Sequence, residues 1–304
     1  NLNSSSTTDA RGTNASSGNF YAGAGVDASG STNLTALTDA AGNALGLENG
    51  DYLSVSASKG TGSITARTFT VGTTGSTLGD LAAFMEDTFG VVSDSNTAAS
   101  EGVRVSGGQI FVQGNIGQSN AITAINISGT DVDPGSTALN NSIFNGFFGP
   151  DAINGFTENT SAAGESSFSQ MVVYDSLGVG HTVDVIYSRA DADQNIWSFF
   201  AVGNDSFSAG SSGTELLSTA GRLEFAASGE VSSFTGNTLS MNLDNGATTP
   251  LEIEVDADQL TQFGTNSDIT LSEQDGFPPG VLESFTIAAT GVVTGIFSNG
   301  LTKD

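Results

Sequence analysis

Apolar and polar residues alternate through the middle of the chain. Two such runs lie between residues 168 and 187, and their apolar members are Phe168, Met171, Val173, Val183, Val185 and Tyr187. This period of two predicts antiparallel strands that bury one face. The intervening Asp175-Ser176-Leu177-Gly178 has turn chemistry, because glycine readily adopts positive φ. A third strand is predicted at 196–199 and contains Trp197, the only tryptophan.

Residues 77–89 follow a helical period instead. Apolar residues recur at intervals of three and four, at Leu78, Leu81, Ala82, Met85 and Phe89. Thr77 and Asp80 have the spacing of a capping box, and Gly90 is a typical stop. We therefore predict a helix over 77–89 that covers one face of a sheet. The strands predicted for that sheet lie at 103–105, 109–112 and 122–127, and the Gly/Ser-rich stretch 203–214 is predicted to be an exposed loop.

Composition favours a folded chain over a disordered one. Of the 304 residues, 40 are glycine and only 13% are charged. Hydrophobic residues nevertheless make up 37%, and 19 phenylalanines are spread through the chain. A chain of this length can bury a core and hold two domains. We expect turn-rich β structure with a little helix.

Charge excludes two classes of partner. The formal net charge is −26, because 33 acidic residues stand against 7 lysines and arginines. Such a field repels nucleic acid and anionic membranes, so neither is expected as a partner. The sequence has no run of about 18 apolar residues and no signal-peptide pattern at its start. It begins with Asn1 instead of methionine, and we expect a fragment of a longer protein.

Candidate chemistry is sparse. The absence of cysteine excludes disulfides, thiolate catalysis and cysteine-zinc sites. His181 is the only histidine, and a structural role is favoured because no nucleophile or orienting partner accompanies it in the sequence. Residues 131–133 and 191–195 resemble the start of calcium loops but lack the glycine and distant glutamate of an EF-hand, so solvated turn carboxylates are favoured. We expect no catalytic residue, no metal site, no cofactor and no enzyme, although paired carboxylates of a glycosidase stay open.

Motifs of a recognisable kind occupy two regions. The first contains V-Y-D-S-L-G at 173–178, then His181, then N-x-W at 195–197. The second contains L-T-Q-F-G at 260–264, Q-D-G-F at 274–277 and G-I-F-S-N-G at 295–300. In this order the motifs resemble those of bacterial flagellar hook proteins, with departures at Val179, Phe277, Thr290, Phe297 and Leu301. The matching residues, for which the resemblance implies structural roles, are Tyr174, Asp175, Ser176, Leu177, Gly178, His181, Trp197, Gln274, Asp275, Gly276, Gly280, Gly291, Gly295, Ser298, Asn299 and Gly300.

The resemblance implies a fold and a division into domains. The fold is mainly β, with an outer domain built as an antiparallel or barrel-like sheet and an inserted β-rich domain that carries the helix at 77–89. We predict that the outer domain comprises 1–20 plus 151–265 and that the insert comprises 21–150. Residues 266–304 are predicted to be part of the next inner domain.

The resemblance also implies a function. Hook subunits self-assemble into a flexible curved tube, a universal joint that transmits motor torque to the filament. Implied partners are other hook subunits and the hook cap, rod and hook–filament junction proteins, on an extracellular flagellum reached through the flagellar secretion apparatus without a cleaved signal peptide. The isolated chain, without the terminal helices of the family, is expected to be a monomer. The alternatives are a distal rod subunit and a calcium- or glycan-binding bacterial surface adhesin.

Overall fold

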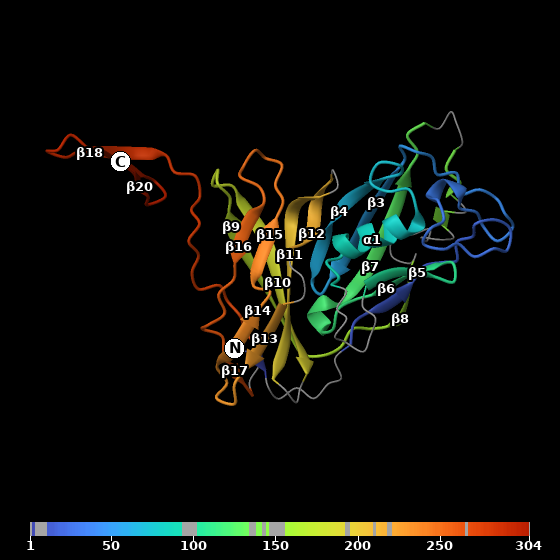
Figure 1. Ribbon diagram of the computed structural model, residues 1–304, viewed down its shortest axis with the longest axis horizontal. Coiled ribbons are helices and arrows are strands. Elements are labelled where there is room, and N and C mark those ends of the chain that lie inside the picture. Colours follow the sequence, from blue (N-terminus) through green and yellow to red (C-terminus); the bar gives the residue numbers. More distant parts are fainter. Residues whose placement is uncertain are drawn as a thin grey trace.

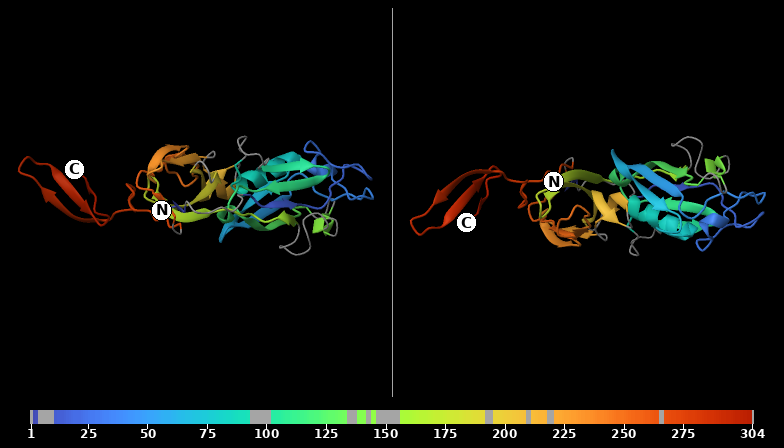
Figure 2. Two further views of the ribbon diagram at one scale, coloured as in Figure 1. Left: turned by 90° about the horizontal axis from the view of Figure 1, so that it is seen from below. Right: turned by 90° about the horizontal axis from the view of Figure 1, so that it is seen from above.

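The molecule is elongated and built mainly from β-strands (Figure 1; Figure 2). The computed structural model describes residues 2–3, 11–92, 102–133, 138–141, 144–145, 156–191, 195–208, 211–217, 221–264 and 267–303. The mainly-β prediction is confirmed, and the described strands form open sheets rather than a closed barrel. A C-terminal hairpin lies at one end, a six-stranded sheet in the middle and a helix-bearing unit at the other end.

The six-stranded sheet is antiparallel and has the order β14-β13-β11-β10-β9, with β12 paired to β11. Its strands are β9 (Ser166–Tyr174), β10 (Gly180–Asp191), β11 (Ile196–Ser208), β12 (Ser211–Leu216), β13 (Gly221–Phe225) and β14 (Val231–Thr235). The predicted strand–turn–strand unit and the third strand are thereby confirmed.

Two details of that prediction are wrong. The stretch 203–214 is not a loop, because it supplies the end of β11 and most of β12, which pair with each other. Phe168 does not share a face with Met171 and Val173, since its offset from each of them along β9 is an odd number of positions. Its side chain is 38% exposed, whereas Met171 and Val173 pack against the core.

Trp197 lies at the centre of the core beneath this sheet. Its strand β11 pairs with β10 on one side and β13 on the other, so Trp197 has Arg189 and Leu223 as neighbours in register. The Trp197 side chain is 0% exposed and shares its cluster with Phe199 and Leu223. The other elements that contribute to this core are β15 (Thr238–Met241), β16 (Leu251–Glu254) and β1 (Leu2–Asn3), which pairs in parallel with β17 (Gln262–Phe263).

The helix-bearing unit consists of α1 between two smaller sheets. One sheet has the order β4-β3-β7 and the other the order β5-β6-β2-β8. Helix α1 packs against β3 and β4 of the first sheet and β5 of the second. The predicted strands 103–105, 109–112 and 122–127 all exist, but the last belongs to the other sheet. The bounds are β2 (Asn14–Ser16), β3 (Tyr52–Lys59), β4 (Gly62–Thr70), α1 (Leu78–Thr88), β5 (Gly102–Ser106), β6 (Gln109–Gln113), β7 (Ile122–Thr130) and β8 (Thr157–Thr160), with 3-10 turns η1 (Leu34–Ala36) and η2 (Gln118–Asn120).

Helix α1 begins with the predicted capping box. The Asp80 N–H donates to Thr77 Oγ1 at 3.1 Å, and the Thr77 N–H donates to Asp80 Oδ2 at 2.9 Å. The Ser76 N–H also donates to Asp80 Oδ2, at 2.8 Å. These bonds satisfy donors that an uncapped helix would leave without partners.

We expect Thr77→Ala to lower the free energy of unfolding by about 1 kcal/mol, because it removes the acceptor for the Asp80 N–H. Urea denaturation followed by circular dichroism measures the loss. Ser76→Ala is the matched control, since it keeps the N–H that donates to Asp80 and should change stability by less than about 0.5 kcal/mol. Equal losses in both variants would contradict a specific capping role.

The helix-bearing unit packs directly on the six-stranded sheet. Val92, which follows α1, forms a buried cluster with Ile186 of β10 and Phe200 of β11. Arg67 of β4 donates from Nη1 to the carbonyl oxygen of Thr214 in β12 at 3.2 Å. Apolar packing and a buried hydrogen bond therefore join the two parts.

A second buried cation lies near this contact. Lys59 Nζ donates to the carbonyl oxygens of Gly90 at 2.6 Å and Phe89 at 3.2 Å, just beyond the C-terminal end of α1. Burial lowers the pKa of Lys59 to about 7, although Asp184 of β10 acts in the opposite direction. The unfolded chain holds this proton up to a higher pH, so this group makes the fold more stable as the pH rises above 7.

The ends of the helix-bearing unit come from distant parts of the chain. β2 pairs with both β6 and β8, which places residues 14–16 and 157–160 in one sheet. These residues lie outside the predicted insert limits of 21 and 150. The division into domains stays a prediction.

Candidate functional site

The turn after β9 is closed by its first residue, Asp175. The Leu177 and Val179 N–H groups donate to Asp175 Oδ1 at 2.8 and 2.9 Å. The backbone N–H of Gly178 donates to the carbonyl oxygen of Asp175 at 2.9 Å. Aspartate favours such turns because its short side chain reaches the backbone two residues on. Gly178 has φ of +80°, a conformation that favours glycine.

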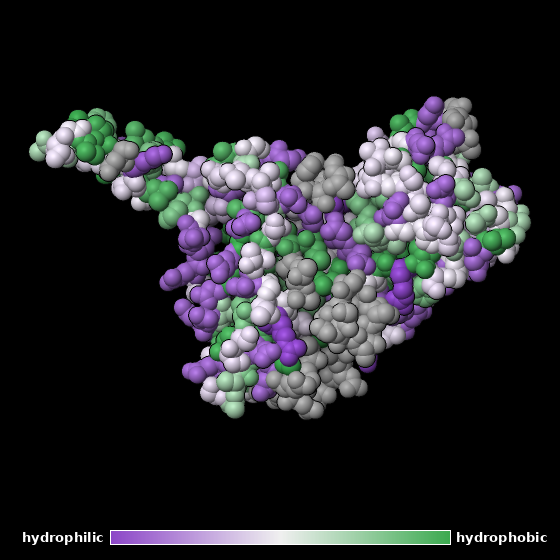
Figure 3. Space-filling model, viewed as in Figure 1, coloured by the Kyte–Doolittle hydropathy of each residue, from purple (hydrophilic) through white to green (hydrophobic). Residues whose placement is uncertain are grey.

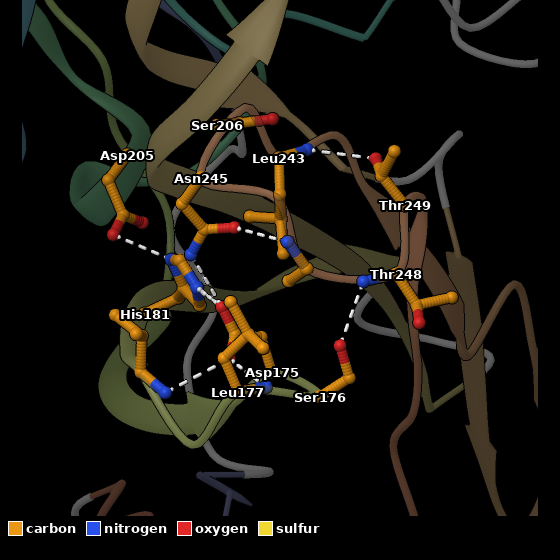
Figure 4. A network of polar contacts seen from close by, with 12 residues as sticks. Asp175, Ser176, Leu177, His181, Asp205, Ser206, Leu243, Asn245, Thr248 and Thr249 are labelled. Atoms are coloured by element: carbon orange, nitrogen blue, oxygen red, sulfur yellow. Dashed lines mark hydrogen bonds and ion pairs between the residues drawn. The ribbon is translucent and has the colours of Figure 1, made fainter.

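His181 ties this turn to two other segments (Figure 4). It is buried near the start of β10, with Nε2 3.0 Å from Asp175 Oδ2 and Nδ1 2.8 Å from Asp205 Oδ2. Asn245, in the loop after β15, donates from Nδ2 to the same Asp175 Oδ2 at 2.6 Å. The network therefore joins the turn, β11 and the 242–249 loop.

The charges in the network support one another. Burial would raise the pKa of Asp175, but hydrogen bonds from His181, Asn245 and the backbone of Val179 and Leu177 hold it well below its usual 3.8. Burial would likewise lower the pKa of His181, yet its bonds to Asp175 and Asp205 raise it above its usual 6.5. The site thus favours an imidazolium between two carboxylates.

The C-terminal segment passes over the same turn. A Cβ added to Gly178 would lie 2.8 Å from the nitrogen of Pro279, and one added to Gly276 would lie 3.2 Å from the Cβ of Tyr174. The Thr248 N–H donates to Ser176 Oγ at 2.8 Å and fixes the neighbouring loop. The C-terminal segment therefore lies close against the turn at Gly178 and Gly276, where a side chain would be in the way.

The same segment holds the C-terminal hairpin. Asn299 Nδ2 donates to the carbonyl oxygen of Pro278 at 2.8 Å, and the Val281 N–H donates to Ser298 Oγ at 3.0 Å. A Cβ at Gly280 would lie 2.5 Å from Asn299 Oδ1, so a larger residue here would displace the Asn299 side chain. The hairpin strands β18 (Leu282–Ile287), β19 (Val293–Phe297) and β20 (Thr302–Lys303) pair with one another and project from the body (Figure 1).

The six-stranded sheet and its turn lie in a segment that has known relatives. Residues 148–277 match the sequence model of the family described as "Flagellar basal body protein FlaE D2 domain". The flagellar hook protein FlgE of Treponema pallidum (strain Nichols) is 26% identical over 171 residues, or 43% of this chain and 35% of that protein. The resemblance to flagellar hook proteins is confirmed.

The hook proteins that match are longer than this chain. The chain spans about a third of the length of the Treponema pallidum hook protein. A crystal structure of the Helicobacter pylori flagellar hook protein FlgE2 covers 83% of this chain and 53% of that chain at 16% identity. The TM-score is 0.30. We refer to residues 148–277 as the hook D2 segment.

The structure brings many of the hook motif residues together where the turn at 175–178 meets the segment that leads to the C-terminal hairpin. We call this place the joint. Around the turn lie Tyr174, Asp175, Ser176, Gly178, His181 and Gly276. At the root of the hairpin lie Gly280, Ser298 and Asn299. The structural roles that the resemblance implies for them stay predictions.

The remaining motif residues do not share these side-chain contacts. Leu177 lies in the turn, but its side chain is 54% exposed, and Trp197 is in the core. Gln274 and Asp275 are exposed in the segment that leads to the joint. Gly291, Gly295 and Gly300 belong to the hairpin, away from the turn.

Sequence reasoning missed two members of the network, Asp205 and Asn245. Asn245-Gly246 is recognisable in the sequence only as a turn, and Asp205 lies in the stretch that was predicted to be a loop. Asp205 reaches His181 through the pairing of β11 with β10, and Asn245 reaches Asp175 through the packing of its loop. Neither contact has a local signal in the sequence.

The acidic stretches have other roles where they are described. Asp131 accepts hydrogen bonds from the N–H groups of Asp133 at 3.0 Å and Leu139 at 3.1 Å, as turn carboxylates do. Residues 192–194 of the second stretch lie outside the described residues. Among the residues that are described, no group of three or more His, Asp or Glu side chains is arranged to hold a metal ion. No helix in the same part of the chain is long and apolar enough to cross a membrane.

Gly178→Ala should lower the free energy of unfolding by about 2 kcal/mol, through positive φ and the clash with Pro279. Gly291→Ala is the matched control, because Gly291 has φ of +85° but open space around its Cβ position. It should cost only the backbone strain, about 1 kcal/mol. Thermal unfolding by calorimetry measures both, and equal losses would show that the contact with Pro279 contributes nothing.

Proposed function

We propose that this chain is a structural, non-enzymatic subunit of the bacterial flagellar hook. The match of residues 148–277 to the FlaE D2 family is the observation that carries this proposal. The motif residues at the joint support it, since they connect the hook D2 segment to the C-terminal hairpin. Many copies would assemble into a flexible curved tube that transmits motor torque to the filament.

Bending of such a tube requires contacts that can slide. Small polar interfaces allow this, whereas large apolar ones hold a single packing. On the face shown in Figure 3, polar, weakly polar and apolar residues are intermixed over the coloured part of the body, and apolar residues also gather on the hairpin. The exposed apolar residues of the hairpin include Leu282, Phe285, Ile287, Val292 and Val293.

The hairpin fits a role as part of the next inner domain, as predicted for residues 266–304. Its apolar side chains would then be covered by other parts of that domain. The outer domain (1–20 plus 151–265) would lie further from the axis of the tube than this inner domain.

Partners and location follow from the hook assignment. Other hook subunits would be the main partner, with hook cap, rod and hook–filament junction proteins at the two ends. The protein would act outside the cell, after export by the flagellar secretion apparatus without a cleaved signal peptide. The isolated chain would be a monomer.

Immunogold electron microscopy of intact cells tests the proposal. Antibody raised against this chain should label the curved segment between cell body and filament. Antibody absorbed with the purified chain is the control and should give no label. Label spread over the cell surface with bare hooks would overturn the proposal in favour of an adhesin, and label confined to purified rods would favour a rod subunit.

A further inference from the structure

The surroundings of His181 specify the protonation state of its ring. Each ring nitrogen lies within 3.0 Å of an aspartate oxygen, Nε2 at Asp175 and Nδ1 at Asp205. An ionised carboxylate only accepts hydrogen bonds, and a neutral imidazole has only one N–H to donate. Both contacts are therefore satisfied together only by the imidazolium, which has two.

The aspartates do not supply the missing proton. Asp175 already accepts hydrogen bonds from Leu177, Val179 and Asn245 as well as His181, so a proton on it would displace one of these donors. The Asp205 side chain is 46% exposed, and water stabilises its ionised form. The bridge that His181 forms between Asp175 and Asp205 therefore depends on the positive charge of the histidine.

The bridge and the joint share the turn at 175–178. The turn that Asp175 closes is the surface on which Pro279 rests, through Gly178. Pro278 in turn accepts the hydrogen bond from Asn299 of the hairpin. A continuous series of contacts thus leads from the imidazole ring to the hairpin.

We propose that His181 is a proton-operated latch: its imidazolium clamps the turn at 175–178 to β11 and so fixes the C-terminal hairpin on the six-stranded sheet, and loss of the proton releases that hold. The charged groups against the ring are Asp175 of the turn and Asp205 of β11, while the 242–249 loop contributes the neutral amide of Asn245. In the neutral ring one nitrogen would present a lone pair to a carboxylate. The half-exposed Asp205 is the partner free to move away into solvent.

The sign of the effect follows from the raised pKa. A histidine that is easier to protonate in the folded state adds stability below its unfolded pKa, and this stability is lost as the pH rises through the folded pKa. Lys59 changes global stability in the opposite direction over an overlapping range, so residue-specific measurements are needed. The latch is a property of the chain alone, so its failure would leave the proposed hook function unaffected.

Nitrogen-15 NMR of histidine-labelled protein gives the first test. The chain has one histidine, so a single titration curve reports on His181. We expect both ring nitrogens protonated at pH 6 and a midpoint above 6.5. Asp205→Asn, which removes one charge but keeps the shape, should lower the midpoint. A wild-type midpoint at or below 6.5, or one unchanged in the variant, would overturn the proposal.

Distance measurement between spin labels gives the second test. Ser233→Cys in β14 and Thr286→Cys in β18 place labels on the sheet and on the hairpin, both at exposed positions in a chain without native cysteine. The distribution should be narrow below the midpoint and broad above it. In His181→Gln, which carries no charge at any pH, it should be broad throughout. A distribution that keeps its width from pH 5.5 to 9 would exclude the latch.

Hydrogen exchange reports on the turn itself. Protection of the Leu177 and Val179 amides, which donate to Asp175, should fall about tenfold above the midpoint, as expected for loss of one charge-assisted hydrogen bond. Amides of the β3–β4 pair serve as an internal reference, since they lie in another sheet. Equal changes in both sets would indicate global loosening and contradict a local latch.

Discussion

Replacing Trp197 with alanine is expected to lower the free energy of unfolding by about 3–5 kcal/mol. The side chain is fully buried where β11 runs between β10 and β13, so its removal leaves a cavity that neighbours on three strands cannot fill. Urea denaturation followed by circular dichroism measures the loss, because the variant lacks the only tryptophan fluorophore. This should be among the most damaging single changes in the hook D2 segment.

Trp197→Phe is the matched comparison. Within the described residues the indole Nε1 is buried without a hydrogen-bond partner, so phenylalanine removes an unsatisfied donor along with part of the volume. We expect it to cost less than about half as much as alanine. A loss below about 1 kcal/mol in Trp197→Ala would show that the core does not depend on this side chain.

Arg67→Ala should separate the helix-bearing unit from the six-stranded sheet. Its buried guanidinium donates to Asp87 Oδ2 at 2.6 Å and to the Thr214 carbonyl at 3.2 Å, and it lies 4.9 Å from the centre of the Phe84 ring. Removal leaves a cavity and a buried carbonyl without this donor. We expect a loss of about 3 kcal/mol, the low end for a buried ion pair, because Asp87 is 36% exposed and can be solvated.

Calorimetry would show this loss as a second transition, since the two parts would unfold at different temperatures. Arg104→Ala is the matched control. That exposed arginine lies 5.6 Å from the centre of the Phe111 ring and should contribute less than about 1 kcal/mol. A single transition with a similarly small loss in Arg67→Ala would contradict the proposed coupling.

Local patterns explain which elements could be predicted. The period-two runs before and after Asp175 and the capping box at Thr77 each involve residues close in sequence, and both exist in the structure. The stretch 203–214 was mispredicted because its glycines and serines favour loops locally. Pairing between β11 and β12, which includes Ser206 opposite Gly213, outweighs that preference.

The members of the joint are the part that sequence patterns could not supply. Asp205 and Asn245 reach the turn only through strand pairing and loop packing. Arg67 and Lys59 are charged residues, which are expected at the surface unless they have partners. Those partners, the Thr214 carbonyl and the end of α1, come from elements distant in the sequence.

The burial of basic side chains also shapes how copies of this protein would meet. Lys59, Arg67 and Arg189 are inside, which leaves only four of the seven basic residues to offset the acidic surface. In the proposed tube, neighbouring subunits would then repel, and dissolved ions would determine how closely they approach. The Debye length falls from about 10 Å at 0.1 M salt to about 3 Å at 1 M. In such an assembly the salinity of the surrounding water would set the stiffness of the tube.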